Sequence, residues 1–162
     1  MTDEDWRLWR AFSSMNRALA RELDRQLQRD AGISSADYSV LITLFEAKEH
    51  RLRTGELAEL LTWEKSRVSH QISRMESRDL VARSECSEDG RGTWITLTPD
   101  GRRATLGAMR DHAAKLREVF FDVLGDDQKA AFRDGAARVL DRINPPSCRI
   151  AAEVFGDEKV GA

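Results

Sequence analysis

The chain has 162 residues, 41% hydrophobic and 33% charged, which is ordinary for a single globular domain. No run approaches the roughly 18 consecutive apolar residues that a membrane-spanning helix needs, and the first residues, MTDEDWRLWR, begin acidic rather than basic. We therefore expect a cytoplasmic protein with no membrane partner. Because the net charge is -2, any surface for nucleic acid must be a local basic patch.

The cysteines and histidines do not form a ligand set. Cys86 and Cys148 lie far apart without a CxxC pair, which argues against a disulfide framework and against a cysteine-rich metal site. His50, His70 and His112 are scattered along the chain. The sequence therefore predicts no metal ion and no cofactor. Lone cysteines such as Cys86 are most often small buried hydrophobic residues.

Two helices are predicted in the first third of the chain. Residues 1–30 place apolar side chains mostly three and four positions apart, which indicates one long amphipathic helix ending near Gly32. These apolar residues are Leu8, Trp9, Phe12, Met15, Leu19, Leu23 and Leu27. The next helix should begin at Ser34, because Asp37 three positions later completes a capping box.

A helix-turn-helix unit is predicted next. After a polar link over residues 48–53, Thr54 is expected to cap a short helix with the sequence GELAELL. Thr62 is expected to cap a further helix, in which Val68, Ile72 and Met75 repeat at i, i+4 and i+7. Only a tight turn separates the two helices. The second helix of such a unit is the one that can enter a DNA groove.

The exposed face of this second helix is thin and polar. At about 100° per residue, the side opposite the apolar residues carries Ser66, Ser69, His70, Ser73 and Ser77, flanked by Arg67 and Arg74. Serines permit close approach to base edges, and arginines supply phosphate or guanine contacts. The local charge is positive, with Lys65, Arg67, Arg74 and Arg78 against Glu64 and Glu76. The alternative is an ordinary solvated helix face.

A β-hairpin follows directly. LVARSEC and TWITLT have β-branched and aromatic character, and the polar turn SEDGRG separates them. Arg91 at the tip can reach into a narrow minor groove. Asp89 either orients Arg91 through a charge-assisted hydrogen bond or serves the turn alone.

Two more helices complete the predicted fold. Thr98 and Pro99 are suited to the start of a helix whose apolar residues form a heptad seam, and a last helix covers residues 126–143. The seam consists of Leu106, Met109, Ala113, Leu116, Phe120 and Val123. These stripes exceed what one core can cover, so we expect a twofold homodimer. Its predicted contacts are Phe12, Leu19, Leu116, Phe120 and Val123. An intramolecular helical hairpin is the alternative.

The order of these elements resembles the MarR family of winged-helix transcriptional regulators. The motifs that carry the resemblance are SRVSHQISRMESRDLVAR and DGR followed by ITLTPDG, and it covers roughly residues 4–143. It implies a recognition helix over 65–74, a wing arginine at Arg91 and a supporting acid at Asp89. It also implies a homodimer on a pseudo-palindromic operator, usually a repressor released by a small ligand or an oxidant. Asp79 departs from the family pattern, which has glycine there.

The predicted fold is therefore mainly α, a winged helix-turn-helix with a small β-hairpin wing and long dimerisation helices. Residues 1–30 and 101–143 form the dimerisation region, 34–100 the DNA-binding region and 144–162 a tail. The predicted DNA contacts are Lys65, Ser66, Arg67, Ser69, His70, Ser73, Arg74 and Arg91. Ser66 and His70 lack a third catalytic partner, so we expect no enzyme. The alternative function is a winged-helix module that binds protein.

Overall fold

The computed structural model describes residues 1–85 and 93–143. Its helices are α1 (Asp3–Ala31), α2 (Ser35–Glu46), the short 3₁₀ segment η1 (Lys48–His50), α3 (Thr54–Leu60), α4 (Lys65–Glu76), α5 (Pro99–Leu116), the π-helical segment η2 (Arg117–Phe121) and α6 (Asp126–Ile143). The strands are β1 (Arg51–Arg53), β2 (Val81–Glu85) and β3 (Thr93–Leu97). This mainly helical chain with one small sheet confirms the predicted fold class.

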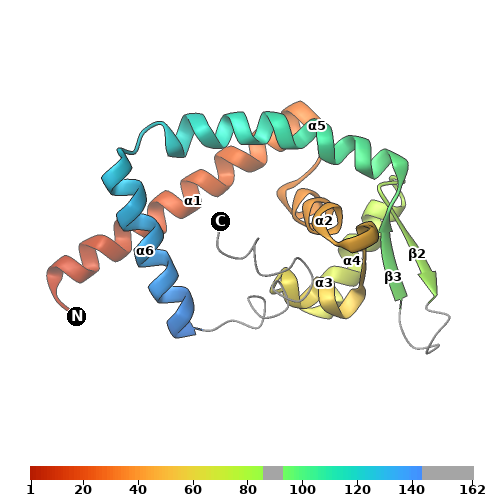
Figure 1. The fold of residues 1–162 in the computed structure, drawn as a ribbon, viewed down its shortest axis with the longest axis horizontal. Helices are drawn as coiled ribbons and strands as arrows, with labels where there is room; N and C mark the ends of the chain where they lie inside the picture. The colour runs from red at the N-terminus through yellow and green to blue at the C-terminus, as the bar shows by residue number, and fades with distance from the viewer. Residues whose placement is uncertain (86–92, 144–162) are drawn as a thin grey trace.

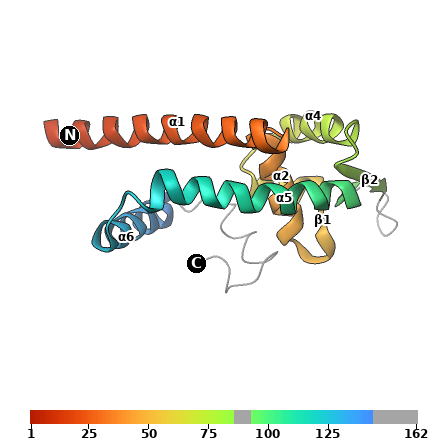
Figure 2. The same ribbon diagram turned by 90° about the horizontal axis from the view of Figure 1, so that it is seen from above.

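The elements divide into a winged-helix body and two helical arms. One arm is the N-terminal part of α1, and the other is the C-terminal part of α5 with η2 and α6 (Figure 1 and Figure 2). Helices α2, α3 and α4 gather beside the sheet at one end of the molecule, and α5 runs from there toward the other end, where α6 lies (Figure 1). The N-terminal half of α1 extends beyond the body, apart from α6 (Figure 2). The arms therefore expose much more of their surface than the body does.

One hydrophobic core lies inside the winged-helix body. Its residues are Leu27, Ile33, Val40, Leu41, Leu44, Ala47, Leu52, Leu57, Ala58, Val68, Ile72, Met75, Leu80, Val81, Ile95 and Ala108. Helix α1 contributes only Leu27 near its C-terminal end, and α5 contributes only Ala108. Beyond these points the apolar residues of the arms do not belong to the core.

The sheet contains a strand that the sequence did not predict. β1 pairs with β3, which also pairs with β2, so the antiparallel order is β1-β3-β2. The prediction that residues 48–53 form only a polar link was wrong. Leu52 is buried opposite Ile95, but a single apolar residue between two arginines gives too short an alternation to indicate a strand.

Both predicted threonine caps around α3 were wrong. Thr54 is already inside α3; Arg53 precedes it, with its backbone N–H donating to Glu56 Oε2 at 2.7 Å. Thr62 ends α3 instead of starting α4, because the Trp63 N–H donates to the Ala58 carbonyl at 2.9 Å. The Thr62 N–H donates to the carbonyl of residue 59 at 3.1 Å, and Thr62 has a φ of 54°. This is a Schellman motif, so the chain turns for two more residues before α4 begins.

A second Schellman motif joins α4 to the sheet. Asp79 has a φ of 56°, and the N–H of Leu80 donates to the Met75 carbonyl at 3.0 Å. The family glycine at this position would adopt this conformation without strain. Asp79 adopts it as well, so the chain keeps the turn despite the departure.

The start of α5 is fixed against that same turn. Thr98 caps the helix by accepting from the Gly101 N–H at 2.9 Å, and Pro99 occupies the first turn, which confirms both predictions. The Thr98 hydroxyl also donates to the Asp79 carbonyl. A Cβ on Gly101 would lie 1.9 Å from the Leu80 carbonyl oxygen, so only glycine allows this close approach.

The predicted heptad seam does not continue as one α-helix. α5 ends at Leu116, the π-helical segment follows, and Val123 lies beyond both, with 68% of its surface exposed. A π-helical turn contains extra residues and shifts the heptad register, which the sequence spacing did not show. The Phe120 ring meets the Phe132 ring of α6 at 5.5 Å between centroids. One seam residue therefore packs within the chain.

We expect Thr62→Gly to stabilise the protein. A β-branched residue with positive φ is strained, and glycine removes that strain, so the free energy of unfolding should rise by about 0.5–1 kcal/mol. Urea unfolding followed by circular dichroism measures the change. Ser77→Gly is the matched control: Ser77 has a helical φ of -63°, so glycine there should lower stability. A less stable Thr62→Gly protein would contradict the argument.

Candidate nucleic-acid interface

Helix α4 separates an apolar face from a polar one. Val68, Ile72 and Met75 are fully buried, as the sequence predicted. The side chains predicted to contact DNA from this helix are all exposed: Lys65, Ser66, Arg67, Ser69, His70, Ser73 and Arg74. The structure therefore places these seven residues on the solvent side of α4.

One buried carboxylate fastens α4 to the helix before it. Asp37 Oδ1 accepts from Gln71 Nε2 of α4 at 2.6 Å, and Oδ2 accepts from Arg78 Nη1 at 2.8 Å. Oδ2 also accepts from the backbone N–H and the hydroxyl of Ser34, each at 2.9 Å. Only 1% of Asp37 is exposed. Asp37, which completes the capping box of α2, therefore also anchors α4.

The surroundings of Asp37 favour its charged form. Burial alone would raise the pKa of this carboxyl, but the hydrogen bonds from Ser34 and from the Arg78 guanidinium outweigh burial and lower the pKa below its ordinary value. A second nitrogen of Arg78 donates to the Gly32 carbonyl at 2.9 Å. Because Arg78 is engaged in this way, its charge does not belong to the exposed basic patch predicted from the sequence.

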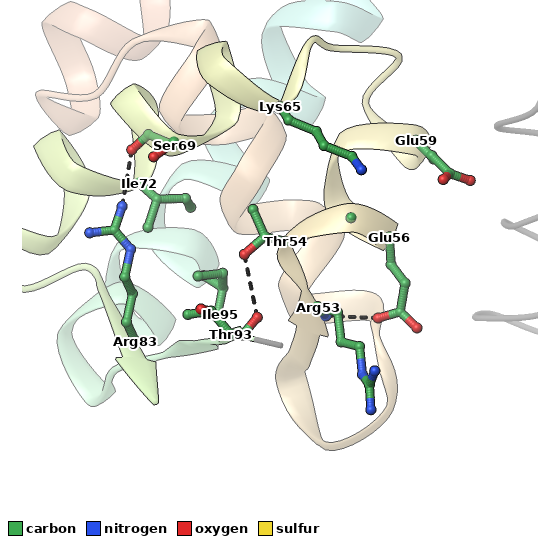
Figure 3. Close-up of a pocket in the computed structure, with 11 residues that line it drawn as sticks. Arg53, Thr54, Glu56, Glu59, Lys65, Ser69, Ile72, Arg83, Thr93 and Ile95 are labelled. Atoms are coloured by element: carbon green, nitrogen blue, oxygen red, sulfur yellow. Dashed lines mark hydrogen bonds between the residues drawn. The ribbon is translucent and has the colours of Figure 1, made fainter. Parts of the chain in front are cut away.

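A strand residue holds the exposed side of α4. Arg83 of β2 donates from Nη2 to the Ser69 carbonyl at 3.0 Å and to Ser73 Oγ at 2.9 Å, and its Nη1 pairs with Glu76 at 2.8 Å. Figure 3 shows Arg83 reaching from the strand to Ser69. Arg83 is not among the site residues predicted from the sequence. The sequence did contain a signal for it. Side chains alternate between the two sides of a strand, so Arg83 lies on the same side of β2 as the buried Val81.

A hollow of about 560 Å³ lies between α3, α4 and the sheet. Lys65, Ser69 and Arg83 line it from one side, and Thr54 and Glu59 line it from another (Figure 3). The wall carries both acidic and basic groups.

Three cations of α4 remain for an external partner. Within residues 1–85 and 93–143, no carboxylate forms an ion pair with Lys65, Arg67 or Arg74. The guanidinium of Arg67 lies over the Trp63 ring, 4.0 Å from its centroid. Glu76 is neutralised by Arg83. The polar face of α4 is therefore locally basic in a chain whose net charge is -2.

The predicted wing contacts lie outside the described residues. β2 and β3 confirm the hairpin, but Asp89 and Arg91 fall between the described segments. Arg91 therefore stays a predicted minor-groove contact, and Asp89 a predicted support. Cys86 and Cys148 also lie outside the described part of the chain, as does the tail over residues 144–162.

The predicted dimer contacts occupy the arms. Phe12 of α1 is 43% exposed, whereas Leu19, Leu116 and Phe120 are half-buried. An apolar hollow of about 310 Å³ is lined by residues that include Leu19, Phe120 and Val123. Because α1 and α5 also pack on each other within the chain, the intramolecular hairpin accounts for part of this apolar surface.

Other kinds of site are not found in the described residues. They contain no group of three or more side chains placed to hold a metal ion. Over the same residues, no helix has the length and apolar character that crossing a bilayer requires. Ser66 and His70 are both exposed on α4, and neither has a hydrogen-bond partner in the described part of the chain that would orient a nucleophile.

The core, the sheet and the exposed α4 define a winged helix-turn-helix protein. The model of the MarR family matches residues 33–93. The chain is similar to AbsC, a MarR family transcriptional regulator from Streptomyces coelicolor, with 32% identity and a TM-score of 0.84; the match covers 89% of this chain and 97% of that one. It is equally similar to Sco3205, a regulator of the same family and organism solved in complex with DNA, with 33% identity and a TM-score of 0.84 over 88% and 93% of the two chains.

A further relative is the HTH-type transcriptional repressor YetL of Bacillus subtilis. It is 26% identical over 113 residues, which cover 70% of this chain and 67% of YetL. The chain therefore belongs to the MarR family of transcriptional regulators. This family is not enzymatic, as predicted from the sequence.

We expect Asp37→Asn to lower the free energy of unfolding by about 1–3 kcal/mol at pH 7, because a buried hydrogen-bonded charge is lost. The folded-state pKa is lowered, so the stability that ionised Asp37 contributes is complete above the unfolded-state pKa of about 4 and is lost as the pH falls through the folded value. Urea unfolding of both proteins from pH 7 to pH 3 measures the difference. A difference that does not shrink toward pH 3 would contradict this assignment.

Proposed function

We propose that this protein is a sequence-specific DNA-binding repressor of transcription that acts as a homodimer on a pseudo-palindromic operator. The observation that carries the proposal is the exposed serine- and arginine-bearing face of α4, anchored from below by Asp37. The DNA complex of the similar protein Sco3205 supports DNA binding. The name of YetL, a repressor, supports repression.

The proposed contacts follow from the chemistry of this face. Short serine side chains keep the leading edge of α4 slim enough for the major groove. Lys65, Arg67 and Arg74 provide positive charge for phosphates or for guanine edges. Because Gln71 and Arg83 fix α4 from two sides, the helix keeps its orientation when it enters the groove.

Exposed apolar residues on the arms support the homodimer. Trp6 is 46% exposed and Trp9 is 57% exposed on α1, and Val139 and Ile143 of α6 are 58% and 65% exposed. A second copy can cover these surfaces through a twofold interface. Two recognition helices related by such an axis should lie about 34 Å apart, which calls for an inverted repeat in the operator.

Release by a small ligand is part of the proposal. A ligand that binds more tightly to a conformation with a different spacing between the two recognition helices would lower operator affinity. The apolar hollow beside Leu19 and Phe120 supports this because it lies on the arms, which would set that spacing.

The first test is selection of bound sequences from random duplex DNA, with the enriched sequences retested at several salt concentrations. We expect an inverted repeat with half-sites about ten base pairs apart and affinity that falls steeply with salt. Binding that shows no sequence preference and disappears at moderate salt would contradict the proposal and favour a protein-binding module.

Arg74→Ala tests the contribution of a single α4 cation. Operator binding should weaken, and the slope of log affinity against log salt should decrease by about 1 if the arginine contacts a phosphate. Arg110→Ala removes the same charge from α5, where the side chain pairs with Asp111, and should leave both quantities unchanged. Equal effects of the two variants would mean that net charge alone, and not the α4 face, determines binding.

Phe12→Glu and Leu140→Glu test the dimer interface. A charge on either exposed apolar arm should shift the protein from dimer to monomer in sedimentation-velocity experiments, because an unpaired charge in an interface is costly. Leu140 is 49% exposed in the single chain, so loss of folding is not expected. Ala131→Glu, at another exposed position of α6, serves as a comparison. A full dimer in both arm variants would show that the interface lies elsewhere.

A further inference from the structure

One aromatic residue of the helix-turn-helix lies directly against a cation of the proposed DNA-binding face. Trp63 occupies the turn between α3 and α4, half-buried and packed on the hydrophobic core. Arg67 lies on the first turn of α4 and is exposed, with its guanidinium carbon 4.0 Å from the centroid of the Trp63 ring. A cation at this distance from an indole ring is within the range of a cation–π interaction.

The geometry points to Trp63 as a positioning residue that holds the Arg67 guanidinium ready for a base edge. This inference rests on the proposed DNA binding. Trp63 itself is not the DNA contact. It acts through Arg67, by limiting the conformations of that side chain before DNA arrives.

The turn that places Trp63 is itself well determined. The Trp63 N–H is bonded to the Ala58 carbonyl in the Schellman motif that ends α3, and Thr62 supplies the left-handed conformation. The ring is thereby fixed relative to α4, with one side against the core and Arg67 over its face. A fixed ring restricts a mobile partner, whereas a mobile ring would not.

The benefit to DNA recognition is entropic and geometric. A free arginine loses rotamer freedom when it binds, and a side chain already held in place loses less. The ring interacts with the flat face of a guanidinium, so the N–H groups along its edges remain available for a bidentate contact with guanine. Residues at the N-terminal end of a recognition helix are the ones that contact base edges, and Arg67 is the third residue of α4.

Two other arginines near α4, Arg78 and Arg83, are held differently. Arg78 is bound to Asp37, and Arg83 is bound to Glu76, so both are neutralised by carboxylates. Arg67 is held by an uncharged ring, and no carboxylate in residues 1–85 or 93–143 pairs with it. Within the described residues, it is the α4 side chain that combines restricted motion with an unneutralised charge.

A double-mutant cycle tests the inference with the operator obtained by selection. Trp63→Leu should weaken operator binding by about three- to tenfold when Arg67 is present. In an Arg67→Lys background, which keeps the charge but not the planar guanidinium, the same change should weaken binding less than about twofold. Fluorescence anisotropy with labelled operator gives the four dissociation constants.

Two further variants separate positioning from folding. Trp63→Phe keeps an aromatic face, so its loss should be smaller than that of Trp63→Leu even though both remove the indole. Trp94→Leu removes a ring that lies under Arg51 and Arg53 on the sheet, 4.7 and 5.3 Å from their guanidinium carbons, and should show no dependence on Arg67. Thermal unfolding of each variant shows whether the fold is retained.

The outcomes that would contradict the inference differ from the one that would contradict the proposed function. If Trp63→Leu weakens binding by the same factor with arginine or lysine at position 67, Trp63 acts through the fold and the inference is wrong. If Trp63→Leu does not fold, the inference is decided by Trp63→Phe, which must again lose more affinity beside arginine than beside lysine. If the wild-type protein binds no duplex DNA, the proposed function itself is wrong.

Discussion

The orientation of α4 depends on the carboxylate of Asp37. This group caps α2 through Ser34 and also accepts from Gln71 and Arg78, so it connects the start of one helix to the middle and the end of another. A buried charge would be costly without partners, and the four donors offset that cost. Arg78 extends the connection to the end of α1 through the Gly32 carbonyl. One carboxylate therefore sets the relative positions of three helices.

Support from both sides of α4 explains why its outer face can consist of small polar and cationic side chains. Asp37 fixes the inner side, and Arg83 of β2 fixes the outer edge through Ser69, Ser73 and Glu76. The exposed residues of α4 are not needed to form the core, so they are free to be small or cationic. The strand that holds α4 also leads into the hairpin. Helix α4 and the first strand of the hairpin, β2, are therefore joined by direct contacts.

The helical arms expose more apolar surface than the body does. The core receives Leu27 from α1 and Ala108 from α5, and apolar side chains farther along both arms remain exposed. The π-helical segment and the contact between Phe120 and Phe132 turn part of the predicted seam inward. Such a surface is typical of a chain that is completed by another copy of itself. The body buries the core residues, whereas the arms leave apolar area exposed in the single chain.

Local sequence by itself determined the existence of the α-helices α1 to α6, the capping of α2 and α5, the hairpin and the buried face of α4. Each of these depends on neighbours a few residues apart: the capping box at Ser34, the start at Thr98 and Pro99, and the spacing of Val68, Ile72 and Met75. Tertiary structure alone decided the third strand at Leu52, the role of Thr62 in ending α3 and the partners of Arg78 and Arg83. These features depend on atoms far apart in the chain, such as Arg78 and Asp37, or on a backbone conformation that the threonine side chain disfavours. Periodicity and capping rules describe near neighbours, and only the folded chain shows which distant donor meets a buried acceptor.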